Sequence, residues 1–218
     1  MNIGVLGGTG KEGSGLAYRW ALRGHDVVIG SRDVSKAEAS AAELNRLLGS
    51  KATVRGTSNA DAAQAQLVVL TVPYAAQLAT ADSVAEHLAA KILIDVTVPL
   101  VPPKVDRVQL PNGESAVVAL QRRLGAAVKV VSAFQNVSAT HLKDAAHEID
   151  CDVLVCGDDA GAREVVVGLA LDAGLRAWHA GPLANSVASE ALTSVLIAIN
   201  KRYKVAGSGI RITGVARK

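Results

Sequence analysis

The sequence predicts an α/β protein whose core is a doubly wound, mostly parallel sheet of the Rossmann type, followed by a small C-terminal helical cap. Short β-branched segments alternate with Ala-rich helical segments along almost all of the 218 residues. Half of the residues are hydrophobic and only 3% are aromatic, which favours an aliphatic core between helices and a buried parallel sheet. A glycine-rich turn, GGTGKEG, directly follows the first predicted strand.

Local patterns define the predicted elements in chain order. β-Branched runs such as NIGVL and LVVLT predict strands at 2–6, 26–30, 53–55, 67–71, 92–95, 128–132, 152–156 and 175–178. Apolar residues at helical spacing predict helices at 11–23, 35–48, 58–64, 75–90, 113–124, 160–172 and 184–203. Gly24 ends the first helix, and Ser35 with Glu38 is predicted to form a capping box at the start of the second.

A proline-rich stretch interrupts this alternation. Four of the six prolines lie between Val96 and Asn112, which excludes a regular helix or inner strand there and predicts a long functional loop. The tail after Gly207 is predicted to be irregular or to form a final short strand. We expect residues 1–182 to form a dinucleotide-binding domain and residues 183–218 to form a small helical segment beside the main sheet.

The glycine turn predicts a phosphate site because it lies between a strand and a helix. Gly8 permits the tight turn, Gly10 lets the backbone approach a diphosphate, and Gly13 lets the helix pack close to the strand. The N-terminus of the following helix supplies N–H groups and a positive dipole end. The cofactor-binding residues expected in this turn are Gly8, Thr9, Gly10, Lys11, Glu12 and Gly13.

The end of the second strand favours NADP over NAD. A site for NAD usually has an acidic residue there for the ribose hydroxyls, whereas this chain has Ser31 and Arg32, with Lys36 one helical turn later. Together with Thr9, these side chains suit a 2′-phosphate. Asp33 is nearby but can instead start the next helix. The alternative for the two cations is an ordinary solvated basic surface.

The carboxyl ends of the later strands are where a second substrate is expected. Thr71, Val72 and Pro73 form an apolar ledge for the cofactor, although proline can simply end the strand. Phe134, Gln135 and Asn136 follow the sixth strand and can position a flat acceptor; equally, Phe134 can be core and the two amides a turn. The remaining cofactor-binding residues expected at strand ends are Val96 and Ala133.

Neither a nucleophile–base pair nor a metal-like histidine spacing is present in the sequence, so no metal is expected, and His179 is the histidine closest to a strand end. Hydride transfer fits this pattern because it requires alignment of cofactors more than proton chemistry.

The net charge of +3 does not indicate a nucleic-acid partner. Cys151 and Cys156 should point to opposite faces of a strand as reduced thiols, and the sequence has neither a signal peptide nor an apolar run of membrane length; we expect a soluble cytoplasmic protein.

The chain resembles the NADPH-dependent reductases of the 5-deazaflavin coenzyme F420, the F420H2:NADP oxidoreductases. The similarity covers almost the whole chain: GGTGKEGSGLA, GSRDVSKAE, TVPY, VPLVPP, VVSAFQNVSA, LVCGDD and AGPLANS occur in this order. It implies reversible hydride transfer between NADP and F420, a 2′-phosphate held by Thr9, Ser31, Arg32 and Lys36, and a homodimer with the last helices near its interface. It also implies an acceptor cleft that residues 183–218 complete and that is lined by Pro99, Leu100, Val101, Val137, Gly181, Pro182 and Leu183.

The sequence departs from this family on the acceptor side. Gln135 stands where the family typically has a histidine near the deazaflavin, and Ser138 stands where some members have proline. Glutamine can hydrogen-bond a ring carbonyl but cannot titrate. Two alternatives therefore stay open: an NADPH-dependent reductase of a flavin, pterin or imine, and a non-catalytic NADP-binding sensor.

Overall fold

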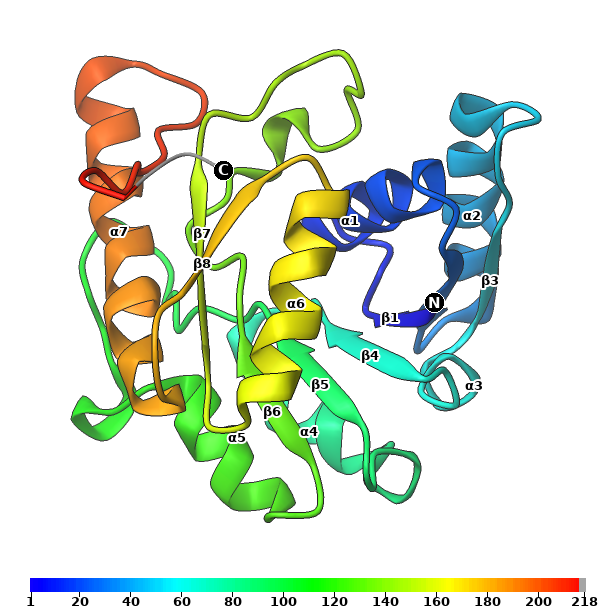
Figure 1. The fold of residues 1–218 in the computed structure, drawn as a ribbon, viewed down its shortest axis with the longest axis horizontal. Helices are drawn as coiled ribbons and strands as arrows, with labels where there is room; N and C mark the ends of the chain where they lie inside the picture. Colours follow the sequence, from blue (N-terminus) through cyan, green and yellow to red (C-terminus); the bar gives the residue numbers. More distant parts are fainter. Residues whose placement is uncertain (216–218) are drawn as a thin grey trace.

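The computed structural model describes residues 1–215 and contains one eight-stranded sheet with the strand order β3-β2-β1-β4-β5-β6-β7-β8 (Figure 1). All neighbouring strands are parallel except β6 and β7, which are antiparallel. The strands are β1 (Asn2–Leu6), β2 (Asp26–Ser31), β3 (Val54–Ser58), β4 (Leu67–Leu70), β5 (Ile92–Asp95), β6 (Lys129–Ser132), β7 (Asp152–Gly157) and β8 (Arg176–His179). The predicted doubly wound, mostly parallel sheet is confirmed.

Seven α-helices and five short 3₁₀ turns connect these strands in the described part of the chain. The α-helices are α1 (Lys11–Leu22), α2 (Val34–Leu48), α3 (Asn59–Ala62), α4 (Gln77–Asp82), α5 (Ala116–Leu124), α6 (Ala160–Asp172) and α7 (Ser186–Tyr203). The 3₁₀ turns are η1 (Tyr74–Ala76), η2 (Ala85–His87), η3 (Pro111–Gly113), η4 (Ala139–His141) and η5 (Leu183–Asn185).

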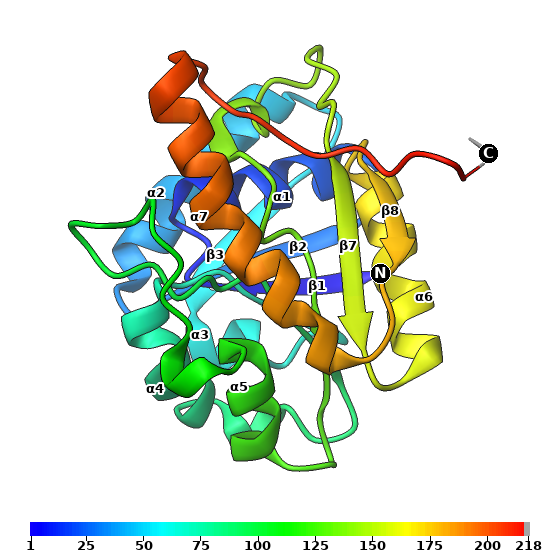
Figure 2. The same cartoon turned by 90° about the vertical axis from the view of Figure 1, so that its left-hand side faces the viewer.

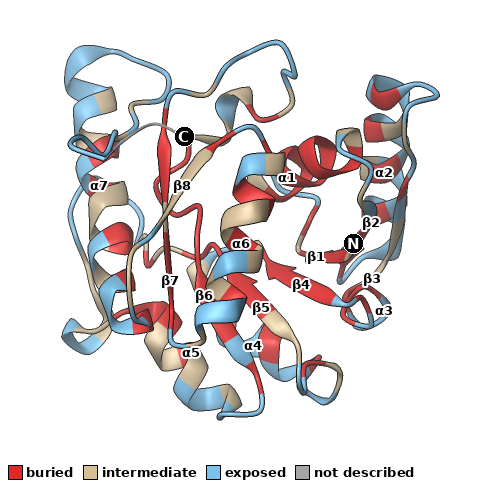
Figure 3. Cartoon of the chain, viewed as in Figure 1, coloured by how far each residue is buried: buried red, intermediate tan, exposed pale blue. Residues whose placement is uncertain are grey.

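Two apolar clusters cover the two faces of the sheet, because alternate residues of a strand point to opposite sides. Val5 of β1 packs with α1, α2 and α6, whereas the next residue, Leu6, packs with α3, α4 and α5. Figure 3 shows the central strands as buried almost throughout. The aliphatic composition thus builds a three-layer structure in which the carboxyl ends of the parallel strands share one edge.

Helix α7 and the tail that follows it lie beside the main sheet; Figure 2 shows the helix crossing in front of the strands. Residues Leu183–Tyr203 are long and apolar enough to span a membrane by length and composition, and 33% of the most apolar window is buried. One such helix is weak evidence for a membrane protein. Residues 208–215 are irregular, which agrees with one of the two predicted alternatives for the tail. The Ile210 carbonyl accepts a hydrogen bond from the Asp152 amide at the start of β7 (2.8 Å).

Several predicted boundaries were wrong for local reasons. Helix α2 begins at Val34 because Asp33 is its N-cap and accepts from the Lys36 amide, so the predicted capping box of Ser35 and Glu38 is wrong. The predicted helix 75–90 is divided into η1, α4 and η2. Just after α4, the Ser83 hydroxyl donates to the Thr80 carbonyl (2.7 Å), a local bond that competes with regular helix.

Two further boundaries reflect backbone contacts. Strand β3 continues to Ser58, beyond the predicted 53–55, because Gly56 lies against α2; a Cβ there would be 2.4 Å from the Ala37 carbonyl carbon. Helix α5 begins at Ala116, not at Gly113, since the Ser115 hydroxyl accepts from the amides of Val117 and Val118.

Candidate functional site

The glycine turn connects β1 to α1 and leaves the N-terminus of α1 open. The Gly8 amide donates to the carbonyl of Val5 (3.2 Å) and to that of Gly30 on β2 (3.1 Å), which fixes the turn against the sheet. Gly10 is the N-cap of α1, and none of the described side chains caps this helix. The first-turn N–H groups therefore point toward the carboxyl edge of the sheet, where they can bind an anion.

The three motif glycines have three different surroundings. A Cβ on Gly8 would lie 2.8 Å from the Val5 carbonyl oxygen, and a Cβ on Gly13 would lie 2.8 Å from the Gly8 Cα. A Cβ on Gly10 would meet only the Gly7 oxygen, at 3.8 Å, which is an ordinary contact. The fold itself therefore excludes side chains at Gly8 and Gly13. The space beside Gly10 is open, and a ligand that approaches the backbone requires such open space.

A cavity of about 200 Å³ adjoins this turn at the carboxyl edge of β1, β2 and β4. Its lining includes five predicted cofactor residues near the turn and strand ends, Thr9, Gly10, Ser31, Arg32 and Thr71, together with Val72 and Pro73. Lys36 does not line it; the Lys36 ammonium lies 3.7 Å from the Asp33 carboxylate, and its side chain is 73% exposed. The structure thus brings seven of the fourteen predicted cofactor-binding residues together around one cavity.

Asp33 is occupied as a helix cap. Its carboxylate accepts from the Ser35 hydroxyl (2.6 Å) and from the Lys36 amide (3.4 Å). The Ser35 hydrogen bond is the main cause that lowers the pKa of Asp33. Because both contacts belong to the start of α2, Asp33 supports the helix, and Arg32 is the charged side chain that reaches the cavity.

Asn59 is a cavity residue that the sequence interpretation missed. Its side chain is 8% exposed, accepts from the Gly7 amide (3.2 Å) and lines the cavity. The Ser58-Asn59 pair was interpreted only as a helix start, and Ser58 does cap α3 by accepting from the Asp61 amide. The contact with Gly7 joins residues 52 positions apart, so local sequence could not reveal it.

Two residues predicted to contact the cofactor are buried in the core. Val96, after β5, is 3% exposed, and Ala133, after β6, is fully buried. Both belong to the cluster that packs against α1, α2 and α6. Their contact with a cofactor stays a prediction that the apolar packing does not favour.

Phe134 also lies in the core, which supports the core alternative for this residue. It is fully buried, and its ring meets that of Trp20 edge-on, with centroids 6.0 Å apart. Its φ of +74° is in the left-handed region, so the backbone turns sharply directly after β6. The buried ring therefore has no surface to offer a flat acceptor.

Gln135 and Asn136 follow this turn and are both buried. The Gln135 side chain donates to the Asp95 carbonyl (2.7 Å), and the Asn136 side chain donates to the Asp152 carbonyl (2.8 Å). The side-chain oxygens of both residues are buried without a hydrogen-bond partner in the described structure. Unpaired buried oxygens are costly, so these two acceptors are candidates for a ligand's donor groups.

The other predicted acceptor residues are distributed over two segments. In the proline-rich loop, Pro99 is buried, Leu100 is partly buried and Val101 is 45% exposed. In the second segment Gly181 is partly buried and Pro182 exposed, whereas the Leu183 amide donates to Asp158 (2.9 Å) and the Leu183 side chain packs against α5. Val137 is 9% exposed behind Phe134. His179 pairs at the surface with Glu164 (2.9 Å).

Buried carboxyl groups lie next to the acceptor segments. Asp95, fully buried at the end of β5, accepts from the Gln77 side chain (2.5 Å) and the Thr97 amide (2.8 Å). Glu190 of α7 accepts from the Ser115 hydroxyl (2.5 Å) and the Ala116 amide (2.8 Å). Burial raises the pKa of both groups above ordinary values. Sequence analysis did not single out either residue.

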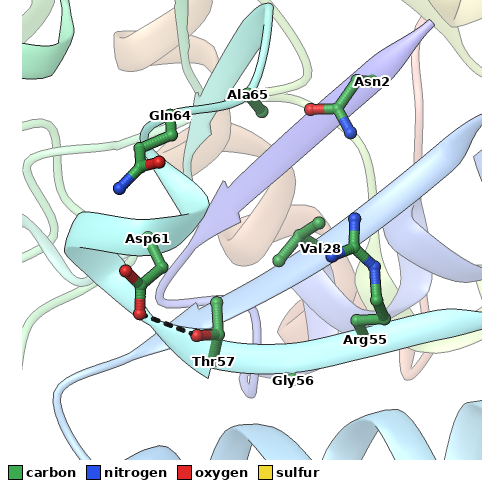
Figure 4. A pocket seen from close by; sticks show the side chains of 8 residues that line it. All are labelled: Asn2, Val28, Arg55, Gly56, Thr57, Asp61, Gln64 and Ala65. Atoms are coloured by element: carbon green, nitrogen blue, oxygen red, sulfur yellow. Dashed lines mark hydrogen bonds between the residues drawn. The ribbon is translucent and has the colours of Figure 1, made fainter.

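A larger groove, of about 590 Å³, lies away from the carboxyl edge, over β2, β3 and α3 (Figure 4). Four of its polar side chains, those of Asn2, Arg55, Thr57 and Asp61, already have partners within the chain. Thr57 donates to Asp61 (2.9 Å), as drawn in Figure 4, and Arg55 lies 3.4 Å from Asp26. The smaller cavity at the glycine turn is therefore the chemically better candidate site.

Among residues 1–215, no group of three His, Cys, Asp or Glu side chains is placed to hold a metal.

Comparisons with known proteins agree with this geometry. The sequence model of the family described as "NADP oxidoreductase coenzyme F420-dependent" matches residues 2–99. An F420-dependent NADP reductase from Methanocaldococcus jannaschii is 42% identical, with 99% of each chain covered. The chain belongs to the F420-dependent NADP reductase family. The corresponding reductase from Methanothermobacter thermautotrophicus is 40% identical, over 99% of this chain and 96% of its own.

A solved structure extends this similarity to three dimensions. The crystal structure of a candidate F420-dependent NADP reductase from Arthrobacter sp. FB24 is 30% identical, covers 97% of this chain and 98% of its own, and has a TM-score of 0.80. Membership of the F420-dependent NADP reductase family, predicted from the sequence, is therefore confirmed. The matched residues 2–99 contain the whole nucleotide cavity, whereas Gln135 and Glu190 lie outside this range.

Proposed function

We propose that this protein is an oxidoreductase that transfers a hydride reversibly between NADP(H) and coenzyme F420. One observation carries the nucleotide half: the open backbone at Gly10 meets a free helix N-terminus, and Arg32 lines the same cavity where a site for NAD would have an acid. Family membership supports the deazaflavin half. When bound, F420 supplies the ring carbon that exchanges the hydride, and the protein positions the two rings.

The residues proposed to hold NADP(H) have distinct tasks. The amides at the start of α1 bind the diphosphate, and Arg32 with Ser31 and Thr9 binds the 2′-phosphate. Val72 and Pro73, at the end of β4, form the apolar ledge. Lys36 is proposed to contribute a longer-range charge, since its side chain is outside the cavity.

Gln135 is proposed to contact the deazaflavin through its side-chain oxygen. Its amide nitrogen is already bound to the Asp95 carbonyl, and its buried oxygen has no partner in the described structure. A free acceptor suits an N–H group of the ring system. The backbone of Gln135 is fixed by Thr193 of α7, whose hydroxyl donates to the Gln135 carbonyl (2.7 Å). Helix α7 is thereby proposed to help complete the acceptor side, as predicted for residues 183–218, of which 216–218 lie outside the described residues.

The test is an absorbance assay in both directions. NADPH with F420 should give loss of the deazaflavin absorbance, and NADP+ with reduced F420 should restore it. Parallel reactions with FMN, a pterin and a cyclic imine, followed by NADPH oxidation, identify another acceptor if F420 is inert. Binding of NADPH without turnover of any acceptor would favour a sensor and contradict the proposed reaction.

A homodimer in the cytoplasm is proposed as the functional state. Helix α7 exposes Val195 (46%), Ile199 (37%) and Tyr203 (71%), and such an apolar helix surface favours a protein partner, here a second copy. The free, buried Cys151 and Cys156 suit a reducing compartment. Sedimentation should give a dimer that Ile199→Glu dissociates; a monomeric wild-type protein would contradict this proposal.

A further inference from the structure

Asn59 lies at the cavity beside the glycine turn with half of its side-chain amide unused. It is the first residue of α3, it is 8% exposed, and it lines the cavity together with Arg32. The Asn59 Oδ1 accepts from the Gly7 amide (3.2 Å). Among residues 1–215, the Asn59 Nδ2 has no hydrogen-bond partner. Since buried polar groups are normally hydrogen-bonded, this nitrogen is a candidate donor to a ligand.

The contact with Gly7 determines which end of the Asn59 amide is available to a ligand. The Gly7 N–H group can only donate, so it requires the amide oxygen and leaves the nitrogen free. A Cβ on Gly30 would lie 2.8 Å from the Asn59 Oδ1, so the missing side chain at Gly30 makes room for this orientation. The Asn59 nitrogen is not fully enclosed, in contrast to the unpartnered oxygens of Gln135 and Asn136. Asn59 therefore presents N–H donors to the cavity that it lines.

The register of the sheet places Asn59 near Arg32. Ser31, the last residue of β2, pairs with Ser58, the last residue of β3, so Arg32 and Asn59 directly follow two neighbouring strand ends. Asn59 therefore lies between Gly7, in the turn proposed to bind the diphosphate, and Arg32, which is proposed to bind the 2′-phosphate. In NADP(H) the adenosine ribose joins these two phosphate groups. A nucleotide bound in this way brings its ribose and 2′-phosphate to the Asn59 amide.

We propose that Asn59 is a specificity-determining residue whose Nδ2 donates a hydrogen bond to the 2′-phosphate of NADP(H). The proposal rests on the proposed nucleotide function and adds to Arg32 a second residue that distinguishes NADP(H) from NAD(H). A site for NAD offers an acidic acceptor to the ribose hydroxyls. Asn59 offers a donor instead, because its oxygen is bound to Gly7. A 2′-phosphate gains more from this donor than a neutral hydroxyl does, because the phosphate oxygen is charged.

Asn59→Asp tests this assignment, because it keeps an oxygen for the Gly7 amide and replaces the donor with a second carboxylate oxygen. The variant loses one hydrogen bond to the 2′-phosphate and repels it, so the dissociation constant for NADP+ should rise by roughly 10- to 150-fold. The 2′-hydroxyl of NAD+ can donate to the new carboxylate, so the dissociation constant for NAD+ should stay within about threefold of the wild-type value or fall. Titration calorimetry with both nucleotides measures the two constants.

Asn59→Leu tests the same assignment without introducing a charge. It removes the bond to Gly7 as well as the donor, so both nucleotides should bind more weakly, and NADP+ should lose roughly tenfold more affinity than NAD+. Asn45→Asp is the matched control, because the Asn45 side chain bonds the amide (2.7 Å) and the carbonyl (2.9 Å) of Val54 and does not line the cavity. This control should keep the wild-type ratio of the two dissociation constants.

The ratio of the NADP+ and NAD+ dissociation constants decides the outcome. A shift toward NAD+ in both Asn59 variants, but not in Asn45→Asp, supports the proposal. An unchanged ratio in both Asn59 variants overturns this proposal alone, because a residue that only fixes the glycine turn affects the two nucleotides equally. Failure of the wild type to bind NADP+ overturns the nucleotide function as well.

Discussion

Replacing Gly10 with alanine should separate binding from folding. The new Cβ would lie 3.8 Å from the Gly7 oxygen, and the backbone angles of Gly10 (φ −71°, ψ 165°) suit any residue. Lower entropy of the unfolded chain stabilises the variant by about 0.4–1 kcal/mol. Alanine is a poorer N-cap than glycine, which costs about the same amount. We therefore expect the free energy of unfolding to change by less than about 0.5 kcal/mol.

The same methyl group should weaken nucleotide binding strongly. It fills the open space in which a diphosphate would approach the N–H groups of α1, and each lost hydrogen bond to a charged group costs about 1.5–3 kcal/mol. Loss of one such bond corresponds to roughly a 10- to 150-fold weaker dissociation constant for NADP+. Calorimetry measures this constant, and denaturant unfolding measures stability on the same samples.

Two glycine variants calibrate the result. Gly168→Ala, in the middle of α6 with no atom within 4 Å of the new Cβ, should gain stability and bind normally. Gly13→Ala should lose stability, since its Cβ would lie 2.4 Å from the Thr71 hydroxyl oxygen. Normal NADP+ binding by Gly10→Ala would refute the phosphate site, and instability like that of Gly13→Ala would show that the fold requires this glycine.

Four further variants test other parts of the structure. Arg32→Ala should weaken NADPH binding by roughly 1.5–3 kcal/mol and NADH binding much less. Equal losses of affinity for the two nucleotides would contradict the assignment of Arg32 to the 2′-phosphate. Phe134→Leu should cost about 1–2 kcal/mol of stability but leave the KM for F420 unchanged, because the ring packs on Trp20; a raised KM would favour the acceptor role. Arg19→Lys should lose at least about 2 kcal/mol and expose residues 141–147 to protease, since Arg19 donates to five carbonyl oxygens. Burial raises the pKa of Glu12, so the native state binds more protons than the unfolded state; wild-type stability should fall between about pH 4.5 and 8 by a few kcal/mol relative to Glu12→Gln, and parallel pH curves would contradict this.

The cavity at the glycine turn was predictable because its signals are local. The glycine turn, the strand before it and Arg32 at the end of β2 lie within the first 32 residues, and a parallel sheet brings such strand ends to one edge. Boundaries were harder to predict where one side chain decides them, as Asp33 does for α2. The role of Asn59 could be identified only from the folded structure, because its side chain accepts a hydrogen bond from the distant Gly7 amide.

The acceptor half was predicted less well because it depends on contacts between distant residues. The Phe-Gln-Asn segment after β6 reads equally as an exposed platform and as a buried turn. Packing against Trp20, more than 100 positions earlier, buries Phe134. A single buried arginine, Arg19, shapes the 141–147 loop from α1 through bonds that span more than 120 positions. Neither Trp20 nor Arg19 belongs to a recognised motif, so the roles of these two residues are visible only in the folded structure.

Helix α7 explains why the predicted acceptor half depends on contacts between residues that are distant in sequence. Its Glu190 accepts from the first amides of α5, directly after the proline-rich loop, and its Thr193 donates to the Gln135 carbonyl directly after β6. One helix near the end of the chain therefore fixes two acceptor segments that are far apart in sequence. Hydride transfer is sensitive to the distance and angle between two rings, so we propose that this bracing acts on the reaction geometry. A change on the buried side of α7 should alter the acceptor KM before it alters NADP+ affinity, because the nucleotide cavity is built entirely from residues before position 81.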